Sequence, residues 1–275
     1  MGVSRERDGR WIVVLGVSSG TGAAIAREAA REGFNVFGVH RGHYMEQAQA
    51  LTQEIEGLGR RIHLRVGDAG TPDGAVAGAQ ELLSVAAPKT VKLFVHSIAS
   101  ASLGPLTSVA EGRVEPRHFQ KTFDAMAHSF VYWTQQLVER DLLAPGAQIL
   151  GLSNSAGDVV MRGTALIAAV KAALGVYVRH LAHELGPTGH RVNLLKFAAV
   201  VTPAVKRTFG EERFTRLQNL IVGTTPAHRM CTVEEVAKLV MLLTTDALSW
   251  FNGATIDFTG GEFQGVLDSL LTPKS

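Results

Sequence analysis

The chain has 275 residues, and 27 Lys and Arg against 25 Asp and Glu leave a net charge of +2. A hydrophobic content of 46% is enough for a sizeable core, which excludes a disordered chain, collagen and a coiled coil. The near-neutral balance argues against nucleic acid or a membrane surface as the main partner. Because we find no long apolar run, and Cys231 has no disulfide partner, we expect a cytoplasmic protein.

The predicted elements alternate short apolar runs with longer amphipathic segments. Strands are predicted at residues 11–17, 34–39, 62–66, 91–96, 148–153, 191–197 and 254–258. Helices are predicted at residues 20–33, 45–58, 73–86, 117–143, 163–185, 203–221 and 232–245. This alternation is typical of a parallel sheet with helices on both faces. The sequence therefore predicts one α/β domain over residues 1–275, a doubly wound Rossmann fold with seven parallel strands in the order 3-2-1-4-5-6-7.

The first predicted strand leads into a turn that contains Gly16, Gly20 and Gly22, and then into a helix. Glycines at such a turn let the backbone approach a pyrophosphate, and the helix N-terminus offers free N–H groups. Ser18 and Ser19 add hydroxyl donors. A tight turn that binds nothing is the alternative, but the strand–turn–helix context favours a dinucleotide site.

The end of the second strand bears on the choice between NAD and NADP. Domains of this type usually place an acidic residue here to bind the ribose hydroxyls, whereas this chain has His40 and Arg41. A guanidinium can pair with a 2′-phosphate and stack on adenine. We therefore expect NADP(H) rather than NAD(H), although Arg41 could also be an ordinary solvated loop residue.

The glycine spacing, Gly-x-x-x-Gly-x-Gly, resembles that of the short-chain dehydrogenase/reductase superfamily, and the resemblance continues along essentially the whole chain. Residues 96–99, His-Ser-Ile-Ala, follow the fourth strand as in the enoyl-acyl-carrier-protein reductase branch. The resemblance implies a small-molecule or acyl-thioester substrate and a homo-oligomer, a tetramer or dimer. It also implies a substrate lid at residues 203–222, or else an interface element there, and a C-terminal tail at 262–275. Further cofactor contacts are implied at Asp68, Ala69, Ser97, Ile98, Ala99, Lys171, Val200 and Thr202.

The catalytic half departs from the superfamily pattern around Lys171. In the superfamily a Tyr acts in proton transfer, and a Lys further along the same helix lowers its pKa. Ile167 stands four residues before Lys171, and Thr164 stands at the seven-residue spacing of the enoyl-reductase branch. The three tyrosines of the chain, Tyr44, Tyr132 and Tyr177, lie elsewhere.

The polar residues that remain could still stabilise an enolate by hydrogen bonding. Asn154 stands where the superfamily has its Ser, and Ser155 follows it. The candidate catalytic residues are therefore Lys171, Ser155, Asn154 and Thr164. We expect no metal, because His180, His183 and Glu184 do not follow the order of a known zinc helix.

Three hypotheses follow from this mixture of kept and lost features. The first is an NADP(H)-dependent reductase of an enoyl or carbonyl acyl substrate with an atypical proton donor. The second is a dinucleotide-binding sensor or regulator without turnover. The third is a non-redox enzyme, catalysing elimination, isomerisation or cyclisation, that reuses the pocket.

Overall fold

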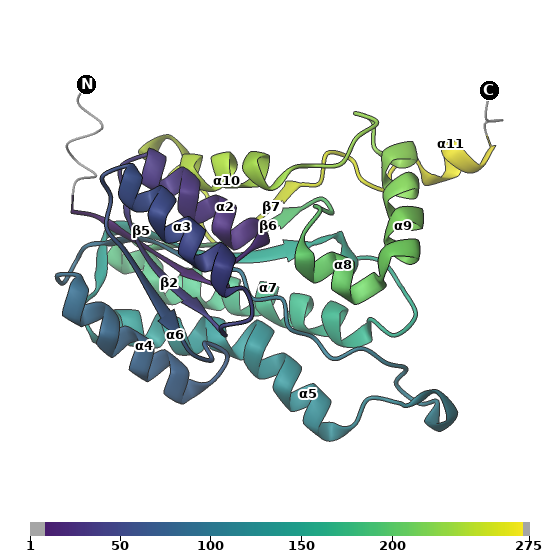
Figure 1. The fold of residues 1–275 in the computed structure, drawn as a ribbon, viewed down its shortest axis with the longest axis horizontal. Coiled ribbons are helices and arrows are strands. Elements are labelled where there is room, and N and C mark those ends of the chain that lie inside the picture. Colours follow the sequence, from purple (N-terminus) through teal and green to yellow (C-terminus); the bar gives the residue numbers. More distant parts are fainter. Residues whose placement is uncertain (1–8, 272–275) are drawn as a thin grey trace.

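The computed structural model describes residues 9–271, without the side chains of residues 204, 208, 209, 268 and 269. Its seven strands form one parallel sheet in the order β3-β2-β1-β4-β5-β6-β7, which confirms the predicted fold (Figure 1). The strands are β1 (Trp11–Leu15), β2 (Asn35–His40), β3 (Ile62–Val66), β4 (Val91–His96), β5 (Leu143–Asn154), β6 (Arg191–Phe197) and β7 (Thr255–Phe258).

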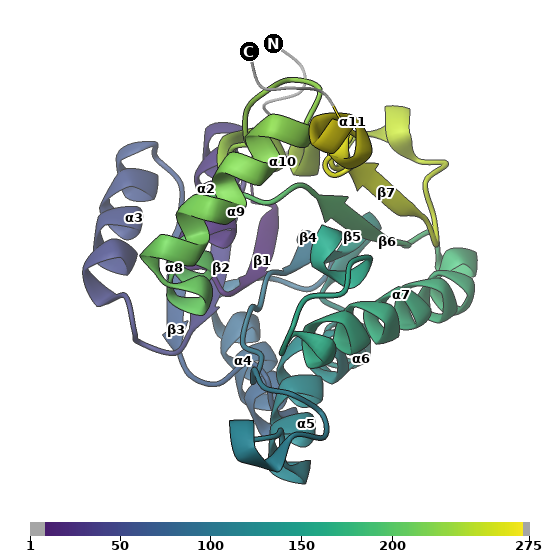
Figure 2. The same cartoon turned by 90° about the vertical axis from the view of Figure 1, so that its right-hand side faces the viewer.

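Helices cover both faces of this sheet (Figures 1 and 2). One face carries α2 (Gly20–Arg31), α3 (Met45–Gly57) and α10 (Val233–Leu242). The other carries α4 (Pro72–Val85), α6 (Ser129–Glu139) and α7 (Ala165–Leu185). Ile12 and Val14 of β1 belong to the first core, and Val13 and Leu15 belong to the second. Both faces are therefore buried, as the uninterrupted apolar sequence of β1 predicts.

The predicted helix 117–143 is wrong at its centre and at its end. It divides into α5 (Pro116–Phe123), a π-helical segment (Asp124–His128) and α6, which ends at Glu139. β5 then begins at Leu143, five residues before the predicted strand. Pro145 and Gly146, which suggested a helix stop, lie inside β5, where its register with β4 shifts and Gly146 has φ +63°. Proline is tolerated in a strand at such an irregularity.

The predicted helix 203–221 is two helices, α8 (Pro203–Phe209) and α9 (Glu211–Thr224). Gly210 separates them with φ +72° and ψ 164°, a conformation that L side chains rarely adopt. The two helices lie to the right of β6 in Figure 1, beyond the end of that strand. The predicted tail contains α11 (Val266–Leu271), and residues 272–275 of it lie outside the described residues.

The segment Ala165–Thr188, which includes α7, is long and apolar enough by length and composition to cross a membrane. Its contacts, however, are those of a core helix. Leu174, Val178 and Ala182 are buried in the cluster that covers one face of the sheet. This packing accounts for the apolar residues on the inner side of the helix.

Candidate functional site

Two adjoining cavities open at the carboxyl ends of the strands, where doubly wound folds bind ligands. The glycine-turn cavity, of about 520 Å³, lies along the ends of β1, β2 and β4. The Glu262 cavity, of about 160 Å³, lies between the ends of β5 and β6 and helix α9. Lys171 lines both, so one ammonium stands where the two cavities meet.

The glycine turn is packed so closely that side chains are excluded. A Cβ on Gly16, which has φ +83°, would lie 2.5 Å from the carbonyl oxygen of Ser97. A Cβ on Gly22 would lie 2.2 Å from the carbonyl oxygen of Gly16. Gly22, in the first turn of α2, therefore lets the backbone of Gly16 pack closely against the helix. Gly22 lines neither cavity.

The N-terminus of α2 is suited to an anion. Its first turn carries no acidic residue, and the Ser19 side chain makes no capping hydrogen bond in this fully described helix. Ser18, Ser19 and Gly20 all line the glycine-turn cavity. Free N–H groups and the positive end of the helix dipole favour a phosphate group at such a position.

The end of β2 adds positive charge to the same cavity. Arg41 donates from Nε to Oδ1 of Asp68 at 3.3 Å and from Nη1 to Oγ of Ser100 at 3.0 Å. Burial lowers the pKa of His40, whose Nδ1 accepts a hydrogen bond from the Gly42 N–H. Arg41 and Arg207 add two guanidinium groups to the lining of this cavity, beside the ammonium of Lys171. These donors fit an anionic dinucleotide.

His96, at the end of β4, is a buried structural residue. It is 1% exposed, and its Nε2 lies 2.8 Å from Oγ of Ser129, which donates to the carbonyl oxygen of Ala125. Because the Ser129 hydroxyl donates elsewhere, its oxygen accepts from His96 Nε2–H. Burial, and then the positive charge of Lys171, lowers the pKa of His96 to about 3, so the imidazole is neutral.

Lys171 lies on α7, with its Nζ donating to the carbonyl oxygen of Leu152 at 2.7 Å. Burial lowers the pKa of this ammonium to about 8. Ile167, four residues earlier, lines the glycine-turn cavity. Thr164 precedes the helix and its hydroxyl donates to the carbonyl oxygen of Met161 at 2.9 Å. Thr164 lines neither cavity, so the structure does not bring it together with Lys171.

Asn154 and Ser155, at the end of β5, line the Glu262 cavity. Oδ1 of Asn154 accepts a hydrogen bond from the backbone N–H of Ala156 at 3.2 Å. An N–H can only donate, so this contact fixes the amide with its oxygen toward Ala156. The Asn154 NH₂ group then has no hydrogen-bond partner among the residues that the structure describes, and it remains available to a ligand.

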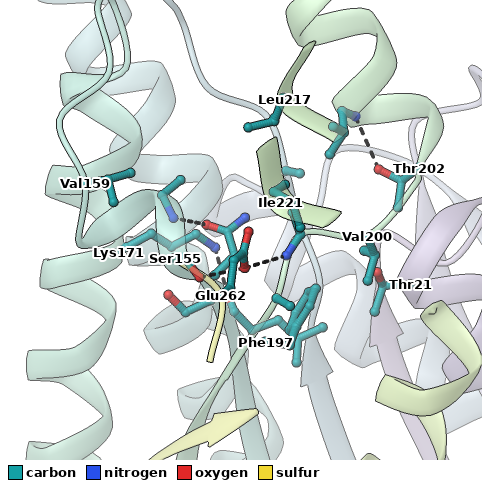
Figure 3. Close-up of a pocket in the computed structure, with 18 of the residues that line it drawn as sticks. Thr21, Ser155, Val159, Lys171, Phe197, Val200, Thr202, Leu217, Ile221 and Glu262 are labelled. Atoms are coloured by element: carbon teal, nitrogen blue, oxygen red, sulfur yellow. Dashed lines mark hydrogen bonds between the residues drawn. The ribbon is translucent and has the colours of Figure 1, made fainter. Parts of the chain in front are cut away.

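Glu262 enters the same cavity from the loop after β7, and sequence reasoning missed it as a site residue (Figure 3). It is 7% exposed, and its Oε2 accepts from Ser155 Oγ and from the Ala199 N–H, both at 2.9 Å. Burial raises the pKa of this carboxyl despite both hydrogen bonds. The available signal was its position just beyond the carboxyl end of a predicted strand, at the edge where ligands bind.

Most of the remaining lining of the Glu262 cavity is apolar. Val205, Leu217 and Ile221 enter it from the predicted lid, and the lid also gives Arg207 to the glycine-turn cavity. The other apolar side chains come from the ends of β4, β5 and β6 and from the loops after β5, β6 and β7: Ile98, Ala99, Leu152, Ala156, Val159, Met161, Phe197, Ala198, Ala199, Val200 and Phe263. Such a lining suits an acyl chain better than a sugar.

The structure thus collects nearly all of the predicted site residues around these two cavities. Gly16, Ser18, Ser19, Gly20, His40, Arg41, Asp68, Ala69, Ser97, Ile98, Ala99, Asn154, Ser155, Lys171, Val200 and Thr202 line one or both. The exceptions are Gly22, which packs beneath the turn, and Thr164, which lies at the start of α7.

Tyr132 and Tyr177 line neither of the two cavities that Lys171 lines. Tyr177 shares a 3.3 Å hydrogen bond with His128, and the Tyr132 hydroxyl donates to Asp124 at 3.4 Å. Of the three, only Tyr44 lines either cavity in the described part of the chain, in the glycine-turn cavity near the end of β2. Cys231 is no nucleophile candidate, because burial raises the pKa of its thiol to about 11. Within residues 9–271, no cluster of His, Cys, Asp and Glu side chains could hold a metal ion.

The chain is similar in sequence to known reductases. A 1-cyclohexenylcarbonyl-CoA reductase of Streptomyces collinus is 25% identical over 249 residues, which span 90% of this chain and 85% of that protein. An enoyl-acyl-carrier-protein reductase (NADH) of Escherichia coli is 28% identical over 168 residues, 61% of this chain and 62% of that protein.

Solved structures share the fold. A short-chain dehydrogenase from Burkholderia cenocepacia in complex with NADP has a TM-score of 0.80 at 23% identity, over 93% of this chain and 98% of that one. L-sorbose reductase from Gluconobacter frateurii, complexed with NADPH and L-sorbose, has a TM-score of 0.80 at 22% identity, over 96% of this chain and 99% of that one.

The family model described as enoyl-(acyl carrier protein) reductase matches residues 16–262, from the glycine turn to the carboxylate of the second cavity. The chain therefore belongs to the enoyl-(acyl carrier protein) reductase family of the short-chain dehydrogenase/reductase superfamily.

Proposed function

We propose that the protein is an NADP(H)-dependent reductase of enoyl thioesters with an atypical proton donor. The observation that carries this proposal is the junction at Lys171 between a cationic cavity and a mostly apolar one. The first suits a dinucleotide, and the second suits an acyl chain. When bound, the nicotinamide would supply a hydride to the substrate.

The cofactor preference rests on Arg41 and Arg207. Both line the glycine-turn cavity, and no carboxylate ends β2 to accept bonds from ribose hydroxyls. A 2′-phosphate would gain charge-assisted hydrogen bonds there. Asp68 lines the same cavity and forms an ion pair with Arg41. This ion pair orients the guanidinium of Arg41.

The polar groups of this site suit an enoyl substrate better than an unactivated ketone. Reduction of an activated C=C produces an enolate, which the free NH₂ group of Asn154 can stabilise through a hydrogen bond to the substrate oxygen. Lys171 adds positive charge at the junction of the cavities. Carbonyl reduction produces a much more basic alkoxide, which needs rapid protonation by an acid such as the superfamily's Tyr.

The direct test is turnover by the purified full chain. With NADPH, we expect reduction of crotonyl-CoA or 1-cyclohexenylcarbonyl-CoA, and little or no reduction of L-sorbose. A folded, NADPH-binding protein that reduces none of the enoyl thioesters would contradict the proposal.

The cofactor preference has its own test, by calorimetric titration of the protein alone. We expect Arg41→Glu to weaken NADPH binding about 10- to 100-fold, because a charge-assisted hydrogen bond contributes about 1.5–3 kcal/mol. NADH binding should change far less. Lys238→Glu, an exposed residue of α10, makes the same charge change and should leave both affinities unaltered.

A binding protein without turnover is the second candidate. It is favoured by the positions of Ile167 and Thr164, which leave Lys171 without a tyrosine on its helix face. In that case NADPH would bind at the glycine-turn cavity, and no acceptor would be reduced.

A non-redox enzyme would instead form product with unchanged NADPH absorbance.

We include a homo-oligomer and a cytoplasmic location in this proposal. Val138 on α6 and Val176 on α7 are 43% and 42% exposed, so the outer sides of these helices offer apolar area for association. Cys231 is a free thiol, which suits a reducing compartment. Light scattering on the eluting protein tests the assembly, and a monomeric mass would contradict it.

A further inference from the structure

The contacts of Glu262 differ between its two carboxyl oxygens. Oε2 accepts from the Ser155 hydroxyl and from the Ala199 N–H, both at 2.9 Å. Oε1 receives no hydrogen bond from any residue that the structure describes. The side chain lines the cavity that Lys171 also lines (Figure 3).

This asymmetry determines where a proton on the carboxyl would sit. A protonated carboxyl keeps one oxygen as a pure acceptor and carries the proton on the other. Because Oε2 already accepts two bonds, Oε1 is the oxygen left to carry the proton. Burial raises the pKa of Glu262, so this carboxyl holds its proton to higher pH than an exposed glutamate does.

Rival acids in the same cavity are few. Among the described residues that line the Glu262 cavity, Lys171 is the other titratable side chain. Its Nζ is directed to the carbonyl oxygen of Leu152. Asn154 and Ser155 carry groups with no useful pKa near neutrality, and Thr164 is outside the cavity. A carboxyl with a raised pKa is well suited to general acid catalysis.

We propose that Glu262 is the proton donor of this active site, delivering the proton from Oε1 while Ser155 and the Ala199 N–H hold Oε2. The inference rests on the proposed function, since it names the acid for enoyl reduction. Reduction adds a hydride to the β-carbon of the enoyl thioester, and NADPH is oxidised to NADP⁺. The Glu262 proton goes to the resulting enolate at its α-carbon, directly or by way of the enol oxygen. The carboxylate left behind regains its proton from water.

Glu262→Gln is the discriminating variant, because an amide keeps the shape and an acceptor oxygen but cannot supply the proton. With wild type reducing crotonyl-CoA, we expect kcat to fall about 100-fold or more, the scale of general acid catalysis, with an unchanged Kd for NADPH. Glu262→Asp keeps a carboxylic acid, so its kcat should lie between that of wild type and that of Glu262→Gln. Glu184→Gln, an exposed residue of α7, is the matched control and should behave as wild type.

A second readout needs neither cofactor nor turnover. Difference infrared spectra of the protein alone at neutral pH should show a protonated-carboxyl band that is lost in Glu262→Gln and kept in Glu184→Gln. Loss of that band together with the loss of kcat would support Glu262 as the acid.

The inference and the proposed function fail in different ways. If wild type reduces enoyl thioesters and Glu262→Gln is equally fast, Glu262 is not the acid and the proposed function stands. If Glu262→Asp is no faster than Glu262→Gln, the acid role is also overturned. If wild type reduces no acceptor, the proposed function fails, and the infrared band still decides whether Glu262 holds a proton.

Discussion

The Nζ of Lys171 donates a 2.7 Å hydrogen bond to the carbonyl oxygen of Leu152, which ties α7 to β5 at the junction of the two cavities. This contact places the ammonium where a cofactor and a substrate would meet. Burial at this position desolvates the amine and lowers its pKa to about 8. The position of Lys171 therefore affects both activity and stability.

Lys171→Met should remove turnover and spare the fold. Methionine fills a similar volume without a buried charge, so we expect the melting temperature at pH 7 to stay close to that of wild type. The rate should fall about 100-fold or more, the cost of losing one positioned electrostatic group. Steady-state kinetics with crotonyl-CoA and thermal unfolding measure the two effects. A variant that unfolds at pH 7 or turns over normally would contradict this role.

The pH dependence of stability should also report Lys171. Its pKa is about 8 in the folded chain and 10.5 for the unperturbed side chain, so between these values the unfolded state binds more protons. The unfolding free energy of wild type should therefore rise, relative to Lys171→Met, as pH increases from 8 to 10.5. Urea unfolding across this range measures the difference, and parallel curves would argue against a desolvated amine.

His96 should destabilise the protein in acid. Its pKa is about 3 when folded against an ordinary value of 6.5, so the unfolded state gains a proton first as pH falls. Stability contributed by the neutral ring is present above pH 6.5 and is lost as pH drops toward 3, by an amount on the order of a few kcal/mol. We expect His96→Gln to show a shallower pH dependence in this window, whereas the exposed His183→Gln keeps the wild-type slope. Equal slopes in all three proteins would contradict a buried neutral His96.

The close approach of Gly22 to Gly16 gives a test of the turn. Gly22→Ala would place a Cβ 2.2 Å from a backbone oxygen that cannot easily move, so we expect a loss of about 1–3 kcal/mol of stability and weaker NADPH binding. Gly57→Ala, in α3 with no atom within 4 Å of the added Cβ, should instead stabilise the helix by about 0.5–1 kcal/mol. If both substitutions changed the free energy of unfolding in the same direction, the turn would not be as tight as described.

The lid can be tested with two leucines of α9. Leu217 lines the Glu262 cavity, whereas Leu220 is 45% exposed. Leu217→Ala should raise KM for crotonyl-CoA roughly 10- to 50-fold, because it removes three carbon groups that contribute up to about 0.8 kcal/mol each when buried against the substrate. Leu220→Ala serves as the control and should leave KM unaltered. Identical KM values in both variants would mean that α9 does not contact the substrate, which is what an interface element would give.

Local sequence patterns were sufficient for the fold. The buried runs of β1 and β4 and the glycine turn each follow from residues that are neighbours in the chain. The predicted end of helix 117–143 was wrong for a local reason. Leu142, Leu143 and Ala144 are apolar and fully or almost fully buried, a pattern that suits the end of a helix and the start of a strand equally well. Its π-helical segment has no comparable local signal.

The candidate site was predicted where one motif held the residues, as at the glycine turn. Glu262 was missed because its partner Ser155 is 107 residues away, and only the folded sheet brings the ends of β5, β6 and β7 together. Thr164 was selected by spacing alone, but its hydroxyl is directed back to Met161. Spacing on a helix fixes the face of a residue, not the cavity that it reaches.

The most direct test of enoyl reduction is the mass of the product formed in D₂O from crotonyl-CoA and unlabelled NADPH. We predict butyryl-CoA with one deuterium, formed in equal amount to the NADPH consumed, since the hydride comes from the cofactor and the other hydrogen from an exchangeable acid. A product of unchanged oxidation state, or no product while NADPH remains bound and unconsumed, would contradict it.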